Sequence, residues 1–236
     1  MSKLLVSVIS AEEALLALEG GADIIDMKNP LEGALGALPL SVVTEAVAAV
    51  NGRRITSATT GDLPMQPIEV CEAVMQMAAT GVDLIKVGFF GDERSNAACV
   101  EALQPLIVQH HLSIVAVLMA DLSPQFALLP LLRKAGFWGV MLDTANKDGR
   151  NLLAHIEQEK LQMFLQMAEG LQTGLAGSLK MENIDTIARL NPSYIGMRGA
   201  ACEGLDRVAR LCKSRVAALS GLLYNCNKLA VSADLA

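Results

Sequence analysis

Eight short strand-like runs alternate with amphipathic helical stretches along the chain, and this alternation limits the possible folds more than any other feature. The runs are mostly apolar throughout, as is typical of parallel strands buried on both faces. Eight strand-then-helix units in 236 residues favour a closed (β/α)8 barrel, the TIM barrel, over an open sheet. We predict strands at 4–8, 23–28, 55–60, 84–89, 114–119, 139–143, 173–176 and 194–198, and helices at 11–18, 41–50, 67–79, 96–108, 124–134, 152–169, 182–189 and 205–219.

The chain shows no internal boundary between domains. Hydrophobic residues make up 52% of it, which is enough for one sizeable core, and neither a linker nor a low-complexity stretch interrupts it. Residues 1–236 are therefore expected to form one barrel domain. Residues 225–236 carry weak signals and could be a tail or an oligomer contact.

The charge pattern and the cysteines indicate a cytoplasmic protein. The net charge is -6 and the basic residues do not cluster, so we expect no nucleic acid partner. Residues 1–10 predict a strand rather than a signal peptide, and no apolar stretch approaches the roughly 18 residues that span a membrane. Short barrels commonly associate, so a homo-oligomer is expected. An odd number of cysteines without a CxxC pair predicts reduced thiols at positions 71, 99, 202, 212 and 226.

Charged side chains on several predicted strands need an explanation, because a strand inside a barrel should be apolar. Side chains alternate between two faces, and the inward parity includes Asp26 and Lys28 on strand two, Lys86 on strand four and Asp143 on strand six. Barrel layers take their side chains from alternate strands, so these groups should meet at one mouth, with Lys147 on the same rim. Buried ion pairs are poor stabilisers, which favours a catalytic role for the group.

Two lysines in such a cluster favour carbonyl chemistry. An ordinary lysine is protonated at neutral pH, but a second ammonium and partial burial lower its pKa. The free amine attacks a carbonyl and forms a Schiff base, while a neighbouring aspartate shuttles protons and the other lysine acts as general acid or base. The cluster therefore predicts aldolase-type chemistry on small carbonyl compounds, with Lys28 and Lys86 as competing nucleophiles.

Small-residue loops after the last two predicted strands indicate a phosphate site. The segments GLAGSL at 174–179 and RGAACEG at 198–204 place Gly177, Ser178, Gly199 and Ala200 where barrels frequently bind phosphate through backbone N–H groups. The expected partner is a small phosphorylated substrate. HExxH, Walker and GxGxxG patterns do not occur, so we expect neither a metal nor a cofactor.

Several stretches of the chain resemble one family. Residues 22–36, ADIIDMKNPLEGALG, carry a fairly specific Asp-x-Lys-Asn-Pro-x-Glu-Gly pattern, and DLIKVG at 83–88, LDTANK at 142–147 and the two glycine loops accompany it. Together they resemble the (5-formylfuran-3-yl)methyl phosphate synthases, also called 4-(hydroxymethyl)-2-furancarboxaldehyde phosphate synthases. Ala34 departs from the pattern, since the family often has serine there.

The resemblance implies a (β/α)8 lyase that joins two glyceraldehyde 3-phosphates through a lysine Schiff base, in the biosynthesis of methanofuran-type one-carbon carriers. One phosphate and two waters are lost in that reaction. The resemblance places the imine on Lys28 and the general base on Lys86, and it matches Asp26, Asp143 and Lys147 to further active-site positions.

Two alternatives stay open from the residues. A Schiff-base aldolase or isomerase acting on another sugar phosphate would have the same fold and phosphate site but would make no furan. A non-catalytic barrel that binds a phosphate ligand would need no amine with a lowered pKa. The joint presence of Lys28, Lys86, Asp143 and Lys147 argues against the second alternative.

Overall fold

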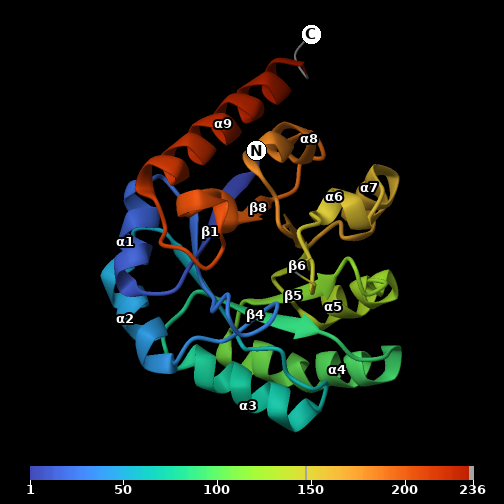
Figure 1. Cartoon of the computed structure of the whole chain (residues 1–236). Coiled ribbons are helices and arrows are strands. Elements are labelled where there is room, and N and C mark those ends of the chain that lie inside the picture. The colour runs from blue at the N-terminus through green and yellow to red at the C-terminus, as the bar shows by residue number, and fades with distance from the viewer. Residues whose placement is uncertain (147, 234–236) are drawn as a thin grey trace.

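The computed structural model describes residues 1–146 and 148–233, in which eight parallel strands close into a barrel (Figure 1). The strands follow one another around the barrel in chain order, and β8 returns to pair with β1. This confirms the (β/α)8 prediction, and each strand lies within one residue of its predicted bounds at either end. The strands are β1 Lys3–Val8, β2 Ile24–Met27, β3 Ile55–Thr59, β4 Leu84–Phe89, β5 Ile114–Met119, β6 Gly139–Asp143, β7 Gln172–Leu175 and β8 Tyr194–Met197.

Helices surround the barrel as an outer ring, and α9 runs past the barrel toward the C-terminus (Figure 1). The helices are α1 Ala11–Glu19, α2 Leu40–Val50, α3 Pro67–Ala78, α4 Glu93–His110, α5 Leu129–Ala135, α6 Leu152–His155, α7 Gln158–Met167, α8 Ile184–Ala188 and α9 Lys213–Ala233. Single 3-10 turns are η1 Phe126–Leu128, η2 Met181–Asn183, η3 Gly199–Ala201 and η4 Glu203–Leu205. The sequence signals were too weak to assign a structure to residues 225–236. Of these, residues 225–233 form the end of α9.

Apolar side chains form one layer inside the barrel and another between the strands and the helices. The inner layer includes Leu5 of β1, Ile24 of β2, Met141 of β6 and Tyr194 of β8. The ring of Tyr194 passes so close to β7 that a Cβ at Gly174 would lie 2.4 Å from it, so only glycine fits there. The inner layer fills the barrel below the lysines, and polar groups are left to its C-terminal mouth.

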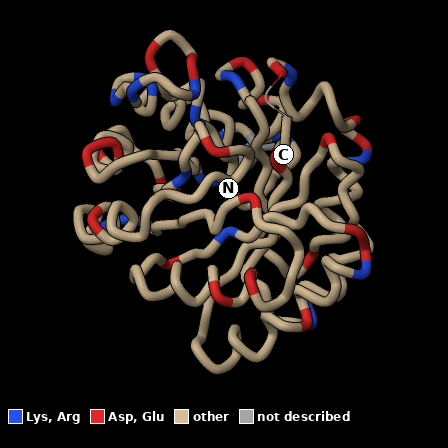
Figure 2. The backbone as a smooth tube through the Cα atoms, turned by 60° about the horizontal axis from the view of Figure 1, so that its bottom comes forward, with Lys and Arg blue, Asp and Glu red and all other residues tan. Residues whose placement is uncertain are grey.

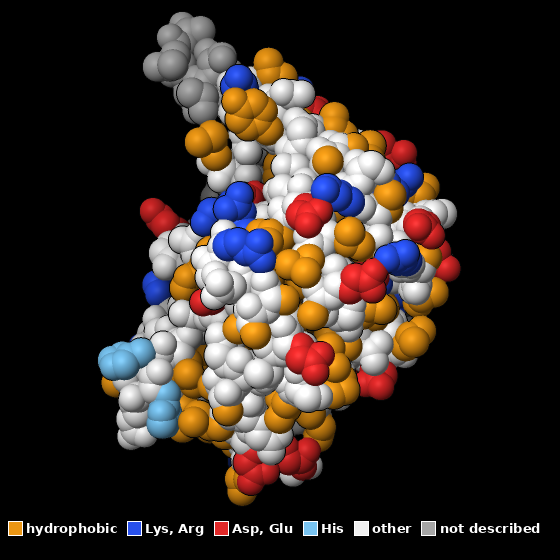
Figure 3. Space-filling view, turned by 90° about the vertical axis from the view of Figure 1, so that its left-hand side faces the viewer, with side chains coloured by type: hydrophobic (Ala, Val, Ile, Leu, Met, Phe, Trp, Pro, Cys, Tyr) orange, Lys and Arg blue, Asp and Glu red, His pale blue; other side chains and the backbone are white. Residues whose placement is uncertain are grey.

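Basic and acidic residues are spread along the outer elements of the chain (Figure 2). On the face made by α1, α2 and α9, acidic and basic side chains are interspersed with apolar ones (Figure 3). Among the helices that the structure describes, none has the length and apolarity needed to cross a membrane.

The helix predicted from residue 205 begins only at Lys213, and residues 205–212 form a turn instead. The guanidinium of Arg198 explains the difference. Its Nε donates to the carbonyl oxygen of Arg207 at 2.7 Å, so this carbonyl is held by a side chain and not by a helical N–H group. A contact from another part of the chain overrides the helical pattern of the segment.

A buried carboxylate ties this turn to the start of the barrel. Glu13 of α1 forms an ion pair with Arg198 at 2.8 Å, and both side chains are 6% exposed. The same carboxylate accepts hydrogen bonds from the amides of Ile9 and Leu211, each at 3.0 Å. Glu13 therefore holds the β1–α1 loop, the end of β8 and the turn together.

We expect Glu13→Ala to lower the free energy of unfolding by about 3–5 kcal/mol, because it leaves the Arg198 charge buried without its partner. Urea titration followed by circular dichroism measures this loss. Glu12→Ala is the matched control, since the neighbouring Glu12 is exposed and pairs with the exposed Arg210. The control should keep its urea midpoint, and equal losses in both variants would contradict the role of Glu13.

Candidate active site

A cavity of about 390 Å³ opens at the C-terminal ends of the strands, within the size range of small-molecule sites. Lys28, Lys86 and Asp143 all line it. Lys86 and Asp143 lie on β4 and β6, and Lys28 directly follows β2; the alternation of side chains along these strands points all three inward. The structure thus brings these three predicted site residues together at one mouth.

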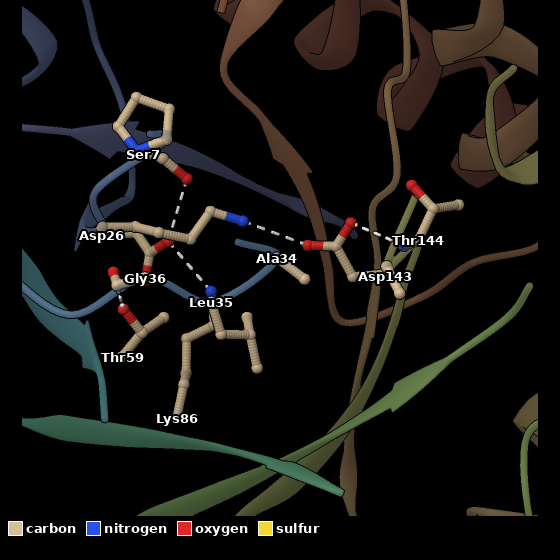
Figure 4. A network of polar contacts seen from close by, with 12 residues as sticks. Ser7, Asp26, Ala34, Leu35, Gly36, Thr59, Lys86, Asp143 and Thr144 are labelled. Atoms are coloured by element: carbon tan, nitrogen blue, oxygen red, sulfur yellow. Dashed lines mark hydrogen bonds and ion pairs between the residues drawn. The ribbon is translucent and has the colours of Figure 1, made fainter. Parts of the chain in front are cut away.

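Asp26 lies fully buried beneath this cluster and accepts hydrogen bonds from three side chains. Its Oδ2 accepts from Nζ of Lys86 and from Oγ of Ser7, each at 2.9 Å, and its Oδ1 accepts from Oγ of Ser57 at 2.6 Å. Figure 4 shows Ser7 pointing toward Asp26. Asp26 therefore holds Lys86 in place from below.

Ser7 and Ser57 were not predicted as site residues, although their positions on the strands indicate that they contact Asp26. Ser7 and Ser57 stand in register with Asp26 on the flanking strands β1 and β3. Neighbours in register on parallel strands point to the same face of the sheet. A hydroxyl at the matching position of two apolar strands therefore indicates a partner for the buried carboxylate.

Burial lowers the pKa of Lys86, whose side chain is 2% exposed. The carboxylate of Asp26 opposes this effect, while the ammonium of Lys28 adds to it, because a like charge disfavours the protonated form. The loss of solvation is the larger effect. A lysine with a lowered pKa is neutral more often at physiological pH and can act as a general base.

Lys28 is the more accessible of the two lysines. Its side chain is 12% exposed, and its Nζ donates to Oδ2 of Asp143 at 3.2 Å. The other oxygen of Asp143 accepts from the amide of Thr144 at 2.7 Å, which fixes the carboxylate at the cavity wall (Figure 4). A substrate carbonyl can therefore reach Lys28 from the cavity, whereas Lys86 lies deeper.

The four residues predicted to bind phosphate line the same cavity as the lysines; they are Gly177, Ser178, Gly199 and Ala200. Gly177 has a φ of 113° and Ser178 a φ of 48°, so the chain turns back sharply at the end of β7. A Cβ at Gly177 would lie 2.8 Å from the side chain of Thr144. The two loops and the amine cluster thus face one shared space.

The loop after Lys28 is held mainly through its backbone. The amide of Ala34 donates to Oδ2 of Asp62 at 2.8 Å, and that of Leu35 donates to Oδ1 at 2.7 Å. Ala34 itself is 2% exposed and packs with the inner apolar layer. Alanine at this position therefore keeps the loop anchored without a side-chain hydroxyl.

Three further cations of the cavity wall were not predicted as site residues; they are Lys180, Arg198 and Arg207. Arg207 lies in a segment whose sequence pattern favoured a helix, which hid its position at the mouth. Lys147 lies outside the described residues. Within the described part of the chain, no group of three His, Cys, Asp or Glu side chains is placed to hold a metal ion.

The model of the 4-HFC-P synthase family matches residues 4–220. The chain belongs to this family. The (5-formylfuran-3-yl)methyl phosphate synthase of Methanosarcina mazei is 39% identical over 214 residues, covering 86% of this chain and 91% of the relative. The synthase of the same name from Methanothermobacter thermautotrophicus is 38% identical over 232 residues, covering 93% and 98%. A Methylorubrum extorquens protein that bears the name provisionally is 42% identical over 217 residues, covering 91% and 89%.

Solved structures show the same barrel. Phosphoribosyl anthranilate isomerase from Thermus thermophilus aligns with a TM-score of 0.68 at 15% identity, covering 94% of this chain and 98% of that one. The 3-hexulose-6-phosphate synthase from Salmonella typhimurium aligns with a TM-score of 0.65 at 17% identity, covering 95% and 99%. These likenesses concern the fold. Membership of the 4-HFC-P synthase family confirms the resemblance seen in the sequence, and the names of its members indicate an enzyme.

Two substitutions should move the pKa of Lys86 in opposite directions. Asp26→Asn removes the charge that favours the ammonium, so the pKa should fall further, and Lys28→Met removes the repelling charge, so it should rise. Carbon-13 labelling at lysine Cε gives the titration midpoint by NMR, with Lys86→Met to assign the signal. In the unsubstituted protein the midpoint should lie below the ordinary 10.5. Shifts of the same sign in both variants would contradict the electrostatic account.

Proposed function

We propose that the protein is a lyase that converts two glyceraldehyde 3-phosphates into (5-formylfuran-3-yl)methyl phosphate through a Schiff base on Lys28. The observation that carries the proposal is an accessible lysine beside a buried lysine of lowered pKa in one cavity, in a chain whose relatives bear this synthase's name. Its place would be the biosynthesis of methanofuran-type one-carbon carriers in the cytoplasm. Loss of one phosphoric acid and two waters from the two trioses balances the equation.

The two lysines would divide the chemistry between them. The amine of Lys28 adds to the aldehyde of one triose and loses water, which gives a protonated imine paired with Asp143. The imine withdraws electrons and acidifies the neighbouring C–H bond. Neutral Lys86 takes this proton, and the resulting enamine attacks the second triose. Elimination of phosphate and dehydration then complete the aromatic ring, and hydrolysis of the imine releases the aldehyde product and frees Lys28.

The retained phosphate would lie between the loops that follow β7 and β8. The hydroxyl of Ser178 and the small residues Gly177, Gly199 and Ala200 border the cavity there. Without bulky side chains, backbone N–H groups can approach a phosphate closely. A phosphate held at this edge would leave the carbonyl end of a triose free to extend toward Lys28.

Incubation with glyceraldehyde 3-phosphate should generate a furan aldehyde phosphate, detected by its ultraviolet absorbance and by mass spectrometry. Borohydride added during turnover should trap a triose on the peptide that carries Lys28. Lys28→Ala and Lys28→Arg should abolish trapping, because neither side chain supplies a free amine. Lys86→Met should slow turnover by about 10²–10⁴-fold and still permit trapping, since it removes only the base.

Each part of this proposal can fail separately. An adduct on Lys86 would reverse the roles of the two lysines and keep the reaction class. Turnover without any trapped adduct would exclude the Schiff base. A product that lacks the furan chromophore would favour an aldolase or isomerase acting on a sugar phosphate.

A charge placed in the phosphate loop should weaken substrate binding. Ser178 has a left-handed backbone, φ 48°, which Asp and Asn both tolerate, so the two substitutions form a matched pair. Ser178→Asp should raise KM for glyceraldehyde 3-phosphate by about tenfold or more through like-charge repulsion, and Ser178→Asn should change it much less. Steady-state kinetics at low ionic strength measures the difference. Equal KM values in the two variants would place the phosphate elsewhere.

A further inference from the structure

The charges around the cavity are unevenly paired. In the described part of the chain, five Lys and Arg residues line it, and three of them form ion pairs: Lys28 with Asp143, Lys86 with Asp26 and Arg198 with Glu13. The other two, Lys180 and Arg207, form no ion pair with any described residue. Lys180 lies two residues after Ser178 and lines the cavity, so we assign it to the phosphate site proposed at that loop. Arg207 remains as a charge that the reaction scheme does not yet use.

Arg207 spans two loops of the cavity mouth. A Cβ at Gly199 would lie 3.8 Å from the Cβ of Arg207, so the start of this side chain adjoins the β8 loop. Its far end reaches the loop after Lys28, where Nη2 donates to the carbonyl oxygens of Pro30 and, at 3.4 Å, of Gly33. The guanidinium therefore lies over the part of the cavity that contains the nucleophile.

The described residues use little of the hydrogen-bonding capacity of this guanidinium. Both of its bonds come from Nη2, and neither Nε nor Nη1 donates to any described residue. A guanidinium presents five N–H donors in a fixed fork, which matches two oxygens of a phosphate. Arg207 can therefore keep the loop through one nitrogen and bind an anion through the others.

The groups that face Arg207 leave it charged. Burial and the positive charge of Arg198 lower its pKa, while Asp143 and Asp206 favour the protonated form. The ordinary pKa of arginine is so high that the guanidinium stays protonated at neutral pH. Asp143 already forms an ion pair with Lys28, and Arg207 forms no ion pair with any described residue. A phosphate dianion that enters the cavity would give Arg207 a close negative partner.

We propose that Arg207 anchors a second phosphate, so that the cavity holds an open-chain six-carbon compound with a phosphate at each end. This inference rests on the proposed function, because joining two triose phosphates gives a molecule of that class. One phosphate lies at the Ser178 loop, the other at Arg207, and the reacting carbons lie between them beside Lys28. Binding of the second phosphate also fixes the loop that follows Lys28.

Two inert probes test the site by titration calorimetry. Mannitol 1,6-bisphosphate has a phosphate at each end and no carbonyl, and glycerol 3-phosphate has a single phosphate. Arg207→Met should weaken the bisphosphate by about 10–100-fold, the usual effect of losing a charge-assisted pair, and the monophosphate by less than about threefold. Arg210→Met is the matched control, because Arg210 lies in the same segment but is exposed and pairs with Glu12. The control should change neither affinity.

Arg207→Lys gives a second, milder test, because it keeps the charge and loses the fork. It should weaken the bisphosphate by about tenfold with the monophosphate unchanged, so the proposal stays testable where Arg207→Met does not fold. Equal weakening of both probes, or no weakening of either, overturns the proposal. If the unsubstituted protein forms the furan but the Arg207 variants show no selective loss of bisphosphate binding, only the second phosphate site is refuted. A selective loss in a protein that makes no furan refutes the proposed reaction and leaves the second site standing.

Discussion

The ion pair between Lys86 and Asp26 is the interaction on which the candidate site depends. It lies inside a barrel whose other inward side chains are largely apolar, so each of its atoms needs a partner. Ser7 and Ser57 supply two of those partners only because β1 and β3 flank β2 in register. Barrel closure therefore does more than enclose a core. It places three donors around one carboxylate and so fixes the amine above it.

This arrangement acts against stability. Folding lowers the pKa of Lys86, so the folded protein takes up that proton less readily than the unfolded chain does. The contribution of this group to stability is therefore lowest below its folded pKa, and it rises as the pH increases through that value toward the ordinary 10.5. Each unit of lowering corresponds to about 1.4 kcal/mol. A buried pair that weakens the fold at neutral pH is better explained by chemistry than by architecture.

The architecture could be predicted from the sequence because its signals are local. Each strand is a short apolar run, and parity along β2, β4 and β6 was enough to bring Lys28, Lys86 and Asp143 to one mouth. The same argument could not show that burial lowers the pKa of Lys86. Burial follows from depth: Lys86 lies within β4 and is 2% exposed, whereas Lys28 directly follows β2 and is 12% exposed.

Features set by contacts between distant segments were not accessible in this way. Residues 205–212 have a helical pattern, yet Arg198 and Glu13 hold their backbone as a turn. No sequence motif around Arg198 or Glu13 indicates that these residues hold the turn. Arg207 was missed for the same reason, since its place at the cavity follows from the turn and not from the pattern around it.

The same long-range contacts connect the scaffold to the chemistry. Glu13 of α1 forms an ion pair with Arg198, and Arg198 donates a hydrogen bond to the carbonyl oxygen of Arg207. The side chain of Arg207 in turn donates to the carbonyl oxygen of Pro30, in the loop that follows Lys28. This series of contacts runs from the first helix, through the end of the last strand, to the loop that follows the nucleophile. It crosses the seam where β1 meets β8, so that loop has this support only in a closed barrel. The position of Lys28 thus depends in part on Glu13, which does not line the cavity. This part of the wall is set jointly by α1 and by the segment that follows β8.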